Sequence, residues 1–267
     1  NNAGLTSSDF NGSISRSAGT AVGTYDYTIG TLSAGPNYTL NLAGTNTFAI
    51  TNRSITITPA PGQSKVYGNG DPVFAYTSSE PLQAGDAFSG ALGREQGKNT
   101  GDYAYTLGSF SAGPNYTLVL GGTNSFAITN RPIVITPVDG QGKVYGNADP
   151  VFAYTASEAL QPDDEYNGSL GRVSGSDVGT YAYTLGSLTA GNNYTLTLGS
   201  SAGFTISPKS VSITPTSGQF KLYGTSDPVF TYTNNAGLNT AAFTGALGRV
   251  AGNNAGNYAF TLNTLSA

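Results

Sequence analysis

Four residue types are missing from this chain of 267 residues: cysteine, histidine, methionine and tryptophan. Without cysteine, the chain has no disulfide framework, no thiolate nucleophile and no cysteine-ligated metal. Without histidine, it has no Ser-His-Asp triad, no imidazole base and no histidine-ligated zinc or haem. These absences exclude several large classes of enzyme and metalloprotein.

Charged residues and long apolar runs are also scarce. Charged residues make up 10% of the chain, against about 25% in an average globular domain. The net charge is −4, so the basic footprint of a nucleic-acid partner is absent. No apolar run reaches the roughly 18 residues of a membrane span. With no initiator methionine and no signal-like apolar region, we expect an internal piece of a longer chain.

The chain is rich in glycine and tyrosine, and it repeats itself. Its 37 glycines, 13 prolines and 17 tyrosines are typical of short strands joined by tight turns. The motif Lys-Val-Tyr-Gly at 65–68 recurs at 143–146, and as Lys-Leu-Tyr-Gly at 221–224, with equal spacing. Residues 54–131 and 132–209 are about 60% identical, which marks a repeat array.

The period divides the chain into four parts. We expect a partial repeat at 1–51, complete repeats at 54–129 and 132–207, and a second partial repeat at 210–267. The first part corresponds to the C-terminal portion of a repeat, and the last to the N-terminal portion. The simplest interpretation is a window taken from a longer array.

Each repeat has the pattern of about seven short strands, because apolar and polar residues alternate with period two. Strands at this spacing indicate a sandwich or barrel. The residues that stay fixed between repeats should form the core, while Ala75, Thr106 and Thr117 should face outward. The expected core of the second repeat is Phe74, Tyr76, Leu92, Tyr103, Leu107, Tyr116, Leu118, Phe126 and Ile128.

Prolines and short connections mark the strand ends. Pro59, Pro137 and Pro215 close the first strand of each repeat, so that strand is either a sheet edge or switches sheets there. Only two residues separate the expected strands 48–51 and 54–58, and the later junctions are equally short. Such connections favour a stiff, elongated rod over flexibly linked domains.

The repeated motifs resemble a known family. The pattern Ile-Thr-Pro, then Lys-Val-Tyr-Gly-x-x-Asp-Pro-x-Phe-x-Tyr-Thr, then Gly-x-Leu-x-Arg and Asn-Tyr-Thr, is similar to MBG-type bacterial immunoglobulin-like repeats, which are related to YDG repeats. The resemblance covers the whole chain. It implies an all-β fold of tandem Ig-like sandwiches within very large secreted adhesins, often of the filamentous-haemagglutinin type. The resemblance carries over no active-site residues.

The recurring lysines and asparagines raise the question of a covalent cross-link. Lys65, Lys143 and Lys221 are candidates for isopeptide bonds to asparagine, and the candidate partners are Asn37, Asn115 and Asn193. The alternative is a turn in which the aspartate that follows each lysine, at 71, 149 and 227, caps the loop. The lysine stem then lies along tyrosine with its amine in water. We favour the turn, because an unpaired buried charge is costly.

The recurring arginines and tyrosines also have two interpretations. Arg94 and its equivalents could bind a ligand, but stacking on a neighbouring tyrosine or pairing with an acid is favoured. Tyr103, Tyr181 and Tyr258 follow a Gly-x pair and resemble a tyrosine corner, in which the hydroxyl bonds the backbone.

Few other motifs indicate chemistry. The acidic residues 163–165 occur in one repeat only, without the ligand spacing of a calcium loop. Asn11, Asn37, Asn115, Asn167 and Asn193 begin glycosylation sequons, a motif common by chance. A glycosidase needs two carboxylates in a cleft, whereas the recurring acids here are single and lie in turns. We therefore expect no catalytic residue, no metal and no cofactor.

Two functions remain in view. The first is a structural segment of an extracellular adhesin stalk on a bacterial surface, of the kind that links cells in a biofilm. Its partners would be the neighbouring repeats of the same chain. The alternative is a repeat that itself binds cell-surface glycans or other copies of the fibre through exposed tyrosine, threonine and asparagine.

Overall fold

A computed structural model describes residues 4–267, and it is essentially all-β. These described residues form short strands and two single-turn 3-10 helices, with no α-helix among them. The chain divides into two compact units. The first comprises Asn1–Thr136, Ala156–Gly168 and Ser187–Gly199, and the second comprises Pro137–Thr155, Ser169–Gly186 and Ser200–Ala267.

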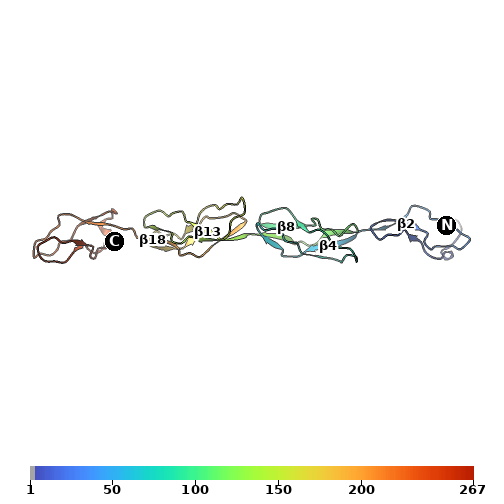
Figure 1. Ribbon diagram of the computed structural model, residues 1–267, viewed down its shortest axis with the longest axis horizontal. Coiled ribbons are helices and arrows are strands. Elements are labelled where there is room, and N and C mark those ends of the chain that lie inside the picture. The colour runs from blue at the N-terminus through green and yellow to red at the C-terminus, as the bar shows by residue number, and fades with distance from the viewer. Residues whose placement is uncertain (1–3) are drawn as a thin grey trace. The chain divides into compact units, whose positions relative to one another are not determined.

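The first unit begins with a small antiparallel sheet in the first repeat. After the 3-10 helix η1 (Ser7–Asp9) come β1 (Ser15–Arg16), β2 (Gly23–Thr28) and β3 (Thr47–Ile50). Strand β2 lies between the other two, and both pairings are antiparallel. Figure 1 labels β2 in the blue part of the chain.

The second repeat, also in the first unit, contains seven strands in two sheets. One sheet has the order β6-β4-β9 and the other has the order β5-β10-β8-β7. Strands β4 and β9 are parallel, as are β5 and β10, while β8 is antiparallel to β10. Figure 1 labels β4 and β8, one from each sheet. The strands are β4 (Arg53–Pro59), β5 (Ser64–Val66), β6 (Tyr76–Ser78), β7 (Gly93–Arg94), β8 (Gly101–Thr106), β9 (Tyr116–Leu120) and β10 (Ser125–Thr129).

The third repeat reproduces these pairings. In the first unit, β11 (Arg131–Pro137) pairs in parallel with β17 (Tyr194–Leu198), as β4 pairs with β9. In the second unit, β18 (Phe204–Ser207) lies between β12 (Gly142–Val144) and β15 (Gly179–Tyr181). The remaining strands are β13 (Tyr154–Ala156), β14 (Gly171–Arg172) and β16 (Tyr183–Thr184).

The second unit also contains the fourth repeat. Strand β19 (Ile213–Pro215) pairs with β20 (Tyr232–Asn234), and β21 (Gly248–Arg249) pairs with β22 (Phe260–Thr261). The 3-10 helix η2 (Thr240–Ala242) lies between these hairpins along the chain, and the Asn239 side chain caps it.

Proline at the end of the first strand marks a change of sheet. Pro59 is the last residue of β4, where it pairs with Tyr76. Strand β4 is central in its sheet, so the edge alternative is wrong. The chain turns after Pro59, and β5 joins the other sheet, which is the second alternative that the sequence left open.

The expected strands are largely confirmed, with two exceptions. The Lys-Val-Tyr-Gly motif was not assigned to a strand, yet Ser64–Val66 forms β5. The alternation of Phe88, Gly90 and Leu92 predicts a strand, but residues 88–92 hold only the isolated bridge between Ser89 and Ser111, and regular pairing begins at Gly93. In both places the glycines and very short pairings hide the period-two signal.

The core agrees with the predicted facing of the strands. Phe74, Leu92, Tyr116, Phe126 and Ile128 are buried as expected. Tyr76, Tyr103, Leu107 and Leu118 are half-buried, and so is Thr106, which was expected to face outward. Ala75 and Thr117 are exposed as predicted. The seven side chains with the least exposure are Phe126, Phe204, Ile55, Ile57, Ile133, Ile135 and Ile206.

An aromatic cluster occupies the core of each complete repeat. The ring of Phe74 lies edge-on to Phe126 at 5.1 Å and to Tyr105 at 5.3 Å between centroids. In the second unit, Phe152 has the same relation to Phe204 at 5.1 Å and to Tyr183 at 5.4 Å. Large edge-to-face aromatic rings let a repeat of this size bury enough apolar surface to fold.

Candidate functional site

One charged cluster recurs in the second, third and fourth repeats. In the second, Asp71 accepts Lys65 Nζ on Oδ1 at 2.6 Å and Arg94 Nε on Oδ2 at 2.8 Å. The lysine and arginine side chains are only 13% and 9% exposed. The same three residue types pair at Asp149 and at Asp227, with distances of 2.6–2.8 Å. One carboxylate thus binds two cations and holds them at the surface of the repeat.

The arginine of this cluster also stacks on aromatic rings. The Arg94 guanidinium lies 4.8 Å from the ring centroid of Tyr103 and 5.5 Å from that of Phe126. Its Nη1 donates to the backbone oxygens of Glu95 and Gly97, both at 2.9 Å. The predicted stacking and acid pairing of this arginine are therefore both confirmed. Its donors are directed at protein groups, which leaves little of the guanidinium for a ligand.

The tyrosine beside this arginine forms the predicted corner. Tyr103 Oη donates to the backbone oxygen of Asn99 at 2.8 Å. Tyr181 and Tyr258 donate to the backbone oxygens of Asp177 and Asn254, at 2.8 and 2.7 Å. This bond pins the chain segment that precedes β8 and its equivalents.

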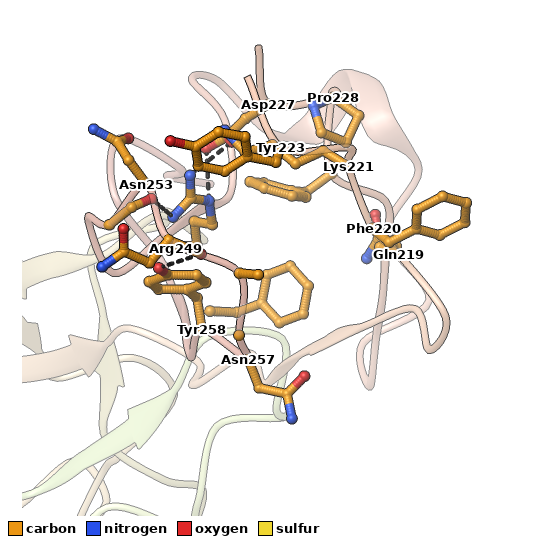
Figure 2. A pocket seen from close by; sticks show the side chains of 16 residues that line it. Gln219, Phe220, Lys221, Tyr223, Asp227, Pro228, Arg249, Asn253, Asn257 and Tyr258 are labelled. Atoms are coloured by element: carbon orange, nitrogen blue, oxygen red, sulfur yellow. Dashed lines mark hydrogen bonds and ion pairs between the residues drawn. The ribbon is translucent and has the colours of Figure 1, made fainter. Parts of the chain in front are cut away.

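Figure 2 shows the cluster in the fourth repeat, where it borders a pocket. Asp227 binds Lys221 and Arg249, and Arg249 stacks on Tyr258 at 4.7 Å. The pocket has a volume of about 380 Å³ and is also lined by Phe220 and several asparagines. In the second repeat, the corresponding position over the arginine holds the ring of Phe126.

The cations change the acidity of the aspartates. Arg94, and then Lys65, lower the pKa of Asp71 below its ordinary value. Arg172 and Arg249 have the same leading effect on the pKa of Asp149 and Asp227. These carboxylates are ionised at neutral pH, and they are acceptors in a salt bridge rather than proton donors.

Hydrogen bonds across the junction between the first and second repeats are the second recurring feature. Asn115 Oδ1 accepts the backbone N–H of Val22 at 2.8 Å. The backbone carbonyl of Asn115 accepts the backbone N–H of Arg53 at 3.0 Å. The Asn52 side chain donates to the backbone oxygen of Pro114 at 2.7 Å. One asparagine therefore connects the loop before β2, the start of β4 and its own turn.

The junction between the second and third repeats uses the same bonds, exactly one repeat further along the chain. Asn193 Oδ1 accepts the backbone N–H of Thr100 at 2.9 Å. The backbone carbonyl of Asn193 accepts the backbone N–H of Arg131 at 2.9 Å. The Asn130 side chain donates to the backbone oxygen of Asn192 at 2.6 Å. The recurrence shows that the sequence specifies the joint as well as the repeat.

Arginine begins the first strand on the far side of each of these joints. Arg53 pairs with Glu80, and Arg131 Nη2 lies 2.6 Å from Glu158 Oε2. Arg131 Nη1 also donates to the backbone oxygen of Tyr67 in the preceding repeat at 3.2 Å. The connecting segments are short, since β3 ends at Ile50 and β4 starts at Arg53.

Comparison with known families decides the identity of the repeats. Four segments of the chain, 2–49, 55–125, 133–205 and 211–267, each match the MBG domain of the YGX type. The chain belongs to the MBG domain family. The resemblance drawn from the Lys-Val-Tyr-Gly and Asn-Tyr-Thr motifs is thereby confirmed. Comparison with curated proteins and with solved structures gives no match.

The MBG repeats place the six cross-link candidates in three different settings. Lys65, Lys143 and Lys221 are each paired with an aspartate rather than an asparagine. Asn37 lies in an exposed turn, whereas Asn115 and Asn193 bond across the joints. Spacing alone could not reveal the joint role, because the partner amides lie 93 residues earlier in the chain.

The acidic residues 163–165 have a different role from the one considered for calcium. Asp164 Oδ2 accepts hydrogen bonds from tyrosine hydroxyls, at 2.9 Å from Tyr67 and 2.7 Å from Tyr194. Within residues 4–267, no group of three or more acidic, histidine or cysteine side chains is arranged to hold a metal ion. In the same described part, no helix is long and apolar enough to cross a membrane.

Proposed function

We propose that this chain is a structural segment of a secreted bacterial surface fibre, an adhesin stalk that projects or links cells. Each MBG repeat is, in this proposal, an Ig-like β-sandwich, and successive repeats join end to end in a stiff, elongated rod. The observation that carries the proposal is the repeated set of asparagine bonds at the joints. A chain of independent binding domains has no need for identical bonds between neighbours.

The joints support a mechanical role through their short length and their polar contacts. So short a connection leaves few backbone torsions free, and the asparagine bonds fix the orientation of the next strand. The core isoleucines of β4 and β11 begin within a few residues of the joint. A load applied to one repeat therefore passes directly into the first strand of the next.

The proposal includes an extracellular location and no catalysis. The complete lack of cysteine suits a long chain that crosses membranes unfolded, because no mispaired disulfide can form. The recurring aspartates are engaged by lysine and arginine, which supports a structural role for them. Protease treatment of intact cells that express the complete gene tests the location: surface repeats are cleaved, and internal ones survive.

Small-angle scattering on this chain tests the rod. We expect an elongated particle with about 40 Å added per repeat, the length of a sandwich of short strands with its end loops. The matched control is a variant with a Gly-Ser linker inserted between Asn130 and Arg131, which should shorten the mean end-to-end distance. A globular particle, or identical scattering from the chain and the control, would overturn the rod.

A second candidate function is lateral contact with other copies of the fibre. Val73, Val151 and Val229 are 92%, 89% and 88% exposed, so three repeats present an almost fully exposed valine at the same position. We propose as the alternative that these valines bind neighbouring fibres. Sedimentation of the chain and of a triple Val→Asp variant distinguishes the two functions, because only the alternative predicts association that the aspartates abolish.

A further inference from the structure

The tyrosine of the second repeat's Lys-Val-Tyr-Gly motif reaches the third repeat. Tyr67 Oη donates to Asp164 Oδ2 at 2.9 Å, and the Tyr67 side chain is 5% exposed. The same oxygen of Asp164 accepts Tyr194 Oη at 2.7 Å. The rings of Tyr67 and Tyr194 meet edge-on at 5.4 Å. One carboxylate oxygen thus ties two tyrosines from adjacent repeats.

The loop that carries Asp164 fits closely against the motif. Gly68 has a positive φ of 84°, and a Cβ there would lie 2.4 Å from Cδ of Gln161. The backbone N–H of Gln161 donates to Tyr194 Oη at 2.8 Å. On the other side, Arg131 donates to the backbone oxygen of Tyr67. The motif of one repeat is therefore enclosed by the loop and the first strand of the next.

The tyrosine hydroxyls stay protonated, as hydrogen-bond donors must. Burial is the leading cause that raises the pKa of Tyr67, and the bond to Asp164 raises it further. Burial likewise raises the pKa of Tyr194 to about 12. At neutral pH, Asp164 therefore receives two O–H donors.

The joint between the third and fourth repeats lacks this arrangement. The motif tyrosine of the third repeat, which the fourth repeat follows, is open to solvent, with Tyr145 46% exposed. Asp86 corresponds to Asp164 in the second repeat, and it accepts Tyr116 Oη at 2.7 Å. In the fourth repeat, the corresponding loop at 235–243 contains no acidic residue at all.

We propose that Asp164 is a specificity-determining residue for repeat pairing: an acid in this loop locks onto the motif tyrosine of the preceding repeat. Joints with such an acid are rigid, and joints without one rely on the asparagine bonds alone. The partner surface is the Tyr67–Gly68 face of an MBG repeat, and the partner is the following repeat of the same chain. This inference rests on the proposed stalk function. The stiffness of the stalk would differ from joint to joint, according to which loops carry the acid.

The natural lack of cysteine allows a direct measurement. Spin labels on Val73→Cys and Val151→Cys, the most exposed large apolar side chains of the second and third repeats, report the distance between these repeats in the full chain. Tyr67→Phe and Asp164→Ala each remove the bond between Tyr67 and Asp164, and loss of this hydrogen bond to a carboxylate should lower the closed-to-open ratio by about tenfold. Each variant should broaden the distance distribution.

Matched controls come from the chain itself. Tyr145→Phe changes the same motif in the third repeat, and Asp86→Ala changes the equivalent acid in the second. Both should leave the distribution unchanged. Tyr194→Phe removes two bonds, to Asp164 and from Gln161, that both lie within the third repeat, and it should broaden the distribution less than Tyr67→Phe. Circular dichroism confirms that each variant is folded before its labels are compared.

Each outcome decides one of the two proposals. A narrow parent distribution that broadens in Tyr67→Phe and Asp164→Ala, with no further broadening in the double variant, supports the lock. A narrow distribution in the parent and in both single variants overturns the lock and leaves the stalk standing. A broad parent distribution overturns the stiff joint and the lock together.

Discussion

At the scale of single residues, Asp71, Asp149 and Asp227 each bind both a lysine and an arginine, which their positions in the sequence do not indicate. The motif pattern predicted that arginine stacks on tyrosine or pairs with an acid, and Arg94 does both. That Lys65 and Arg94 share the carboxylate of Asp71 was not predicted, because Arg94 lies 23 positions after Asp71 in the sequence. Only the fold brings the loop after β5 close to the short strand β7 of the same sheet.

The shared aspartates make stability depend on acid. The pKa of Asp71 and of Asp149 is lowered in the folded chain, so each carboxylate stabilises the fold at pH values above its unfolded pKa of about 4. That contribution is lost as the pH falls below about 4 and through the lowered folded pKa. We expect the thermal unfolding midpoint of the parent chain to drop over this range.

Variants test the assignment of that acid dependence. Asp71→Asn with Asp149→Asn should lower the midpoint at pH 7 and flatten its pH dependence below about 4. Asp102→Asn, an exposed position on β8, is the control and should keep the parent profile. Circular dichroism melts across the pH range provide the measurement. Equal acid sensitivity in the double variant and the parent would contradict the assignment.

At the scale of elements, the period-two alternation predicted the longer strands. The other strands form where backbone segments distant in the sequence come close together. Strands β8, β9 and β10 follow from period-two patterns. Strand β5 could not be predicted, because it forms parallel to β10, which lies near the other end of the repeat in sequence. Parallel pairing needs a long crossover, so no local turn signal announces it. The hydrogen bonds of Asn115 and Asn193 across the joints were also missed, because their partner amides are far away in the sequence.

The first glycine of the Gly-x-Leu-x-Arg motif, Gly90, lies close to the backbone of Ser109. At Gly90 the φ is 72°, and a Cβ would lie 2.1 Å from the backbone oxygen of Ser109. Gly113 has a φ of 84°, but a Cβ there meets nothing within 4 Å. Gly113→Ala should therefore cost about 1 kcal/mol of unfolding free energy, for the strained backbone alone.

Gly90→Ala should cost clearly more than Gly113→Ala, because the bridge between Ser89 and Ser111 must also shift. Denaturant titrations of the two variants and the parent give the comparison. Equal losses for the two variants would show that the close approach at Gly90 is relieved without cost.

At the scale of the whole molecule, the covalent state of the array is a measurable property. Each recurring lysine is held in an ion pair with a carboxylate that a second cation also binds. An isopeptide bond needs the amine to face the carboxamide of asparagine, and this pairing places it against an aspartate instead. We therefore expect the intact mass to equal that of the sequence, 27.2 kDa. A loss of about 17 Da per complete repeat, one ammonia, would instead establish Lys–Asn isopeptide bonds.

The joints give the molecule a second periodicity, one made of bonds between repeats rather than within them. Asn115 and Asn193 each accept a backbone N–H of the preceding repeat, from Val22 and Thr100 respectively. Alanine at either asparagine removes the acceptor and leaves the backbone bonds of its own turn in place. The corresponding amide should then exchange its hydrogen about tenfold faster, in line with the loss of one buried hydrogen bond.

Amide exchange read at single residues makes this prediction specific to each joint. Asn193→Ala should speed exchange at Thr100 and leave Val22 at its parent rate, while Asn115→Ala should do the reverse. Asn37→Ala changes the same motif position in an exposed turn, so it should alter neither amide. Two joints that respond independently are what a repeating set of local bonds requires. If either variant sped exchange at both amides, the joints would be coupled through the repeat between them, and stiffness would belong to the array rather than to each joint.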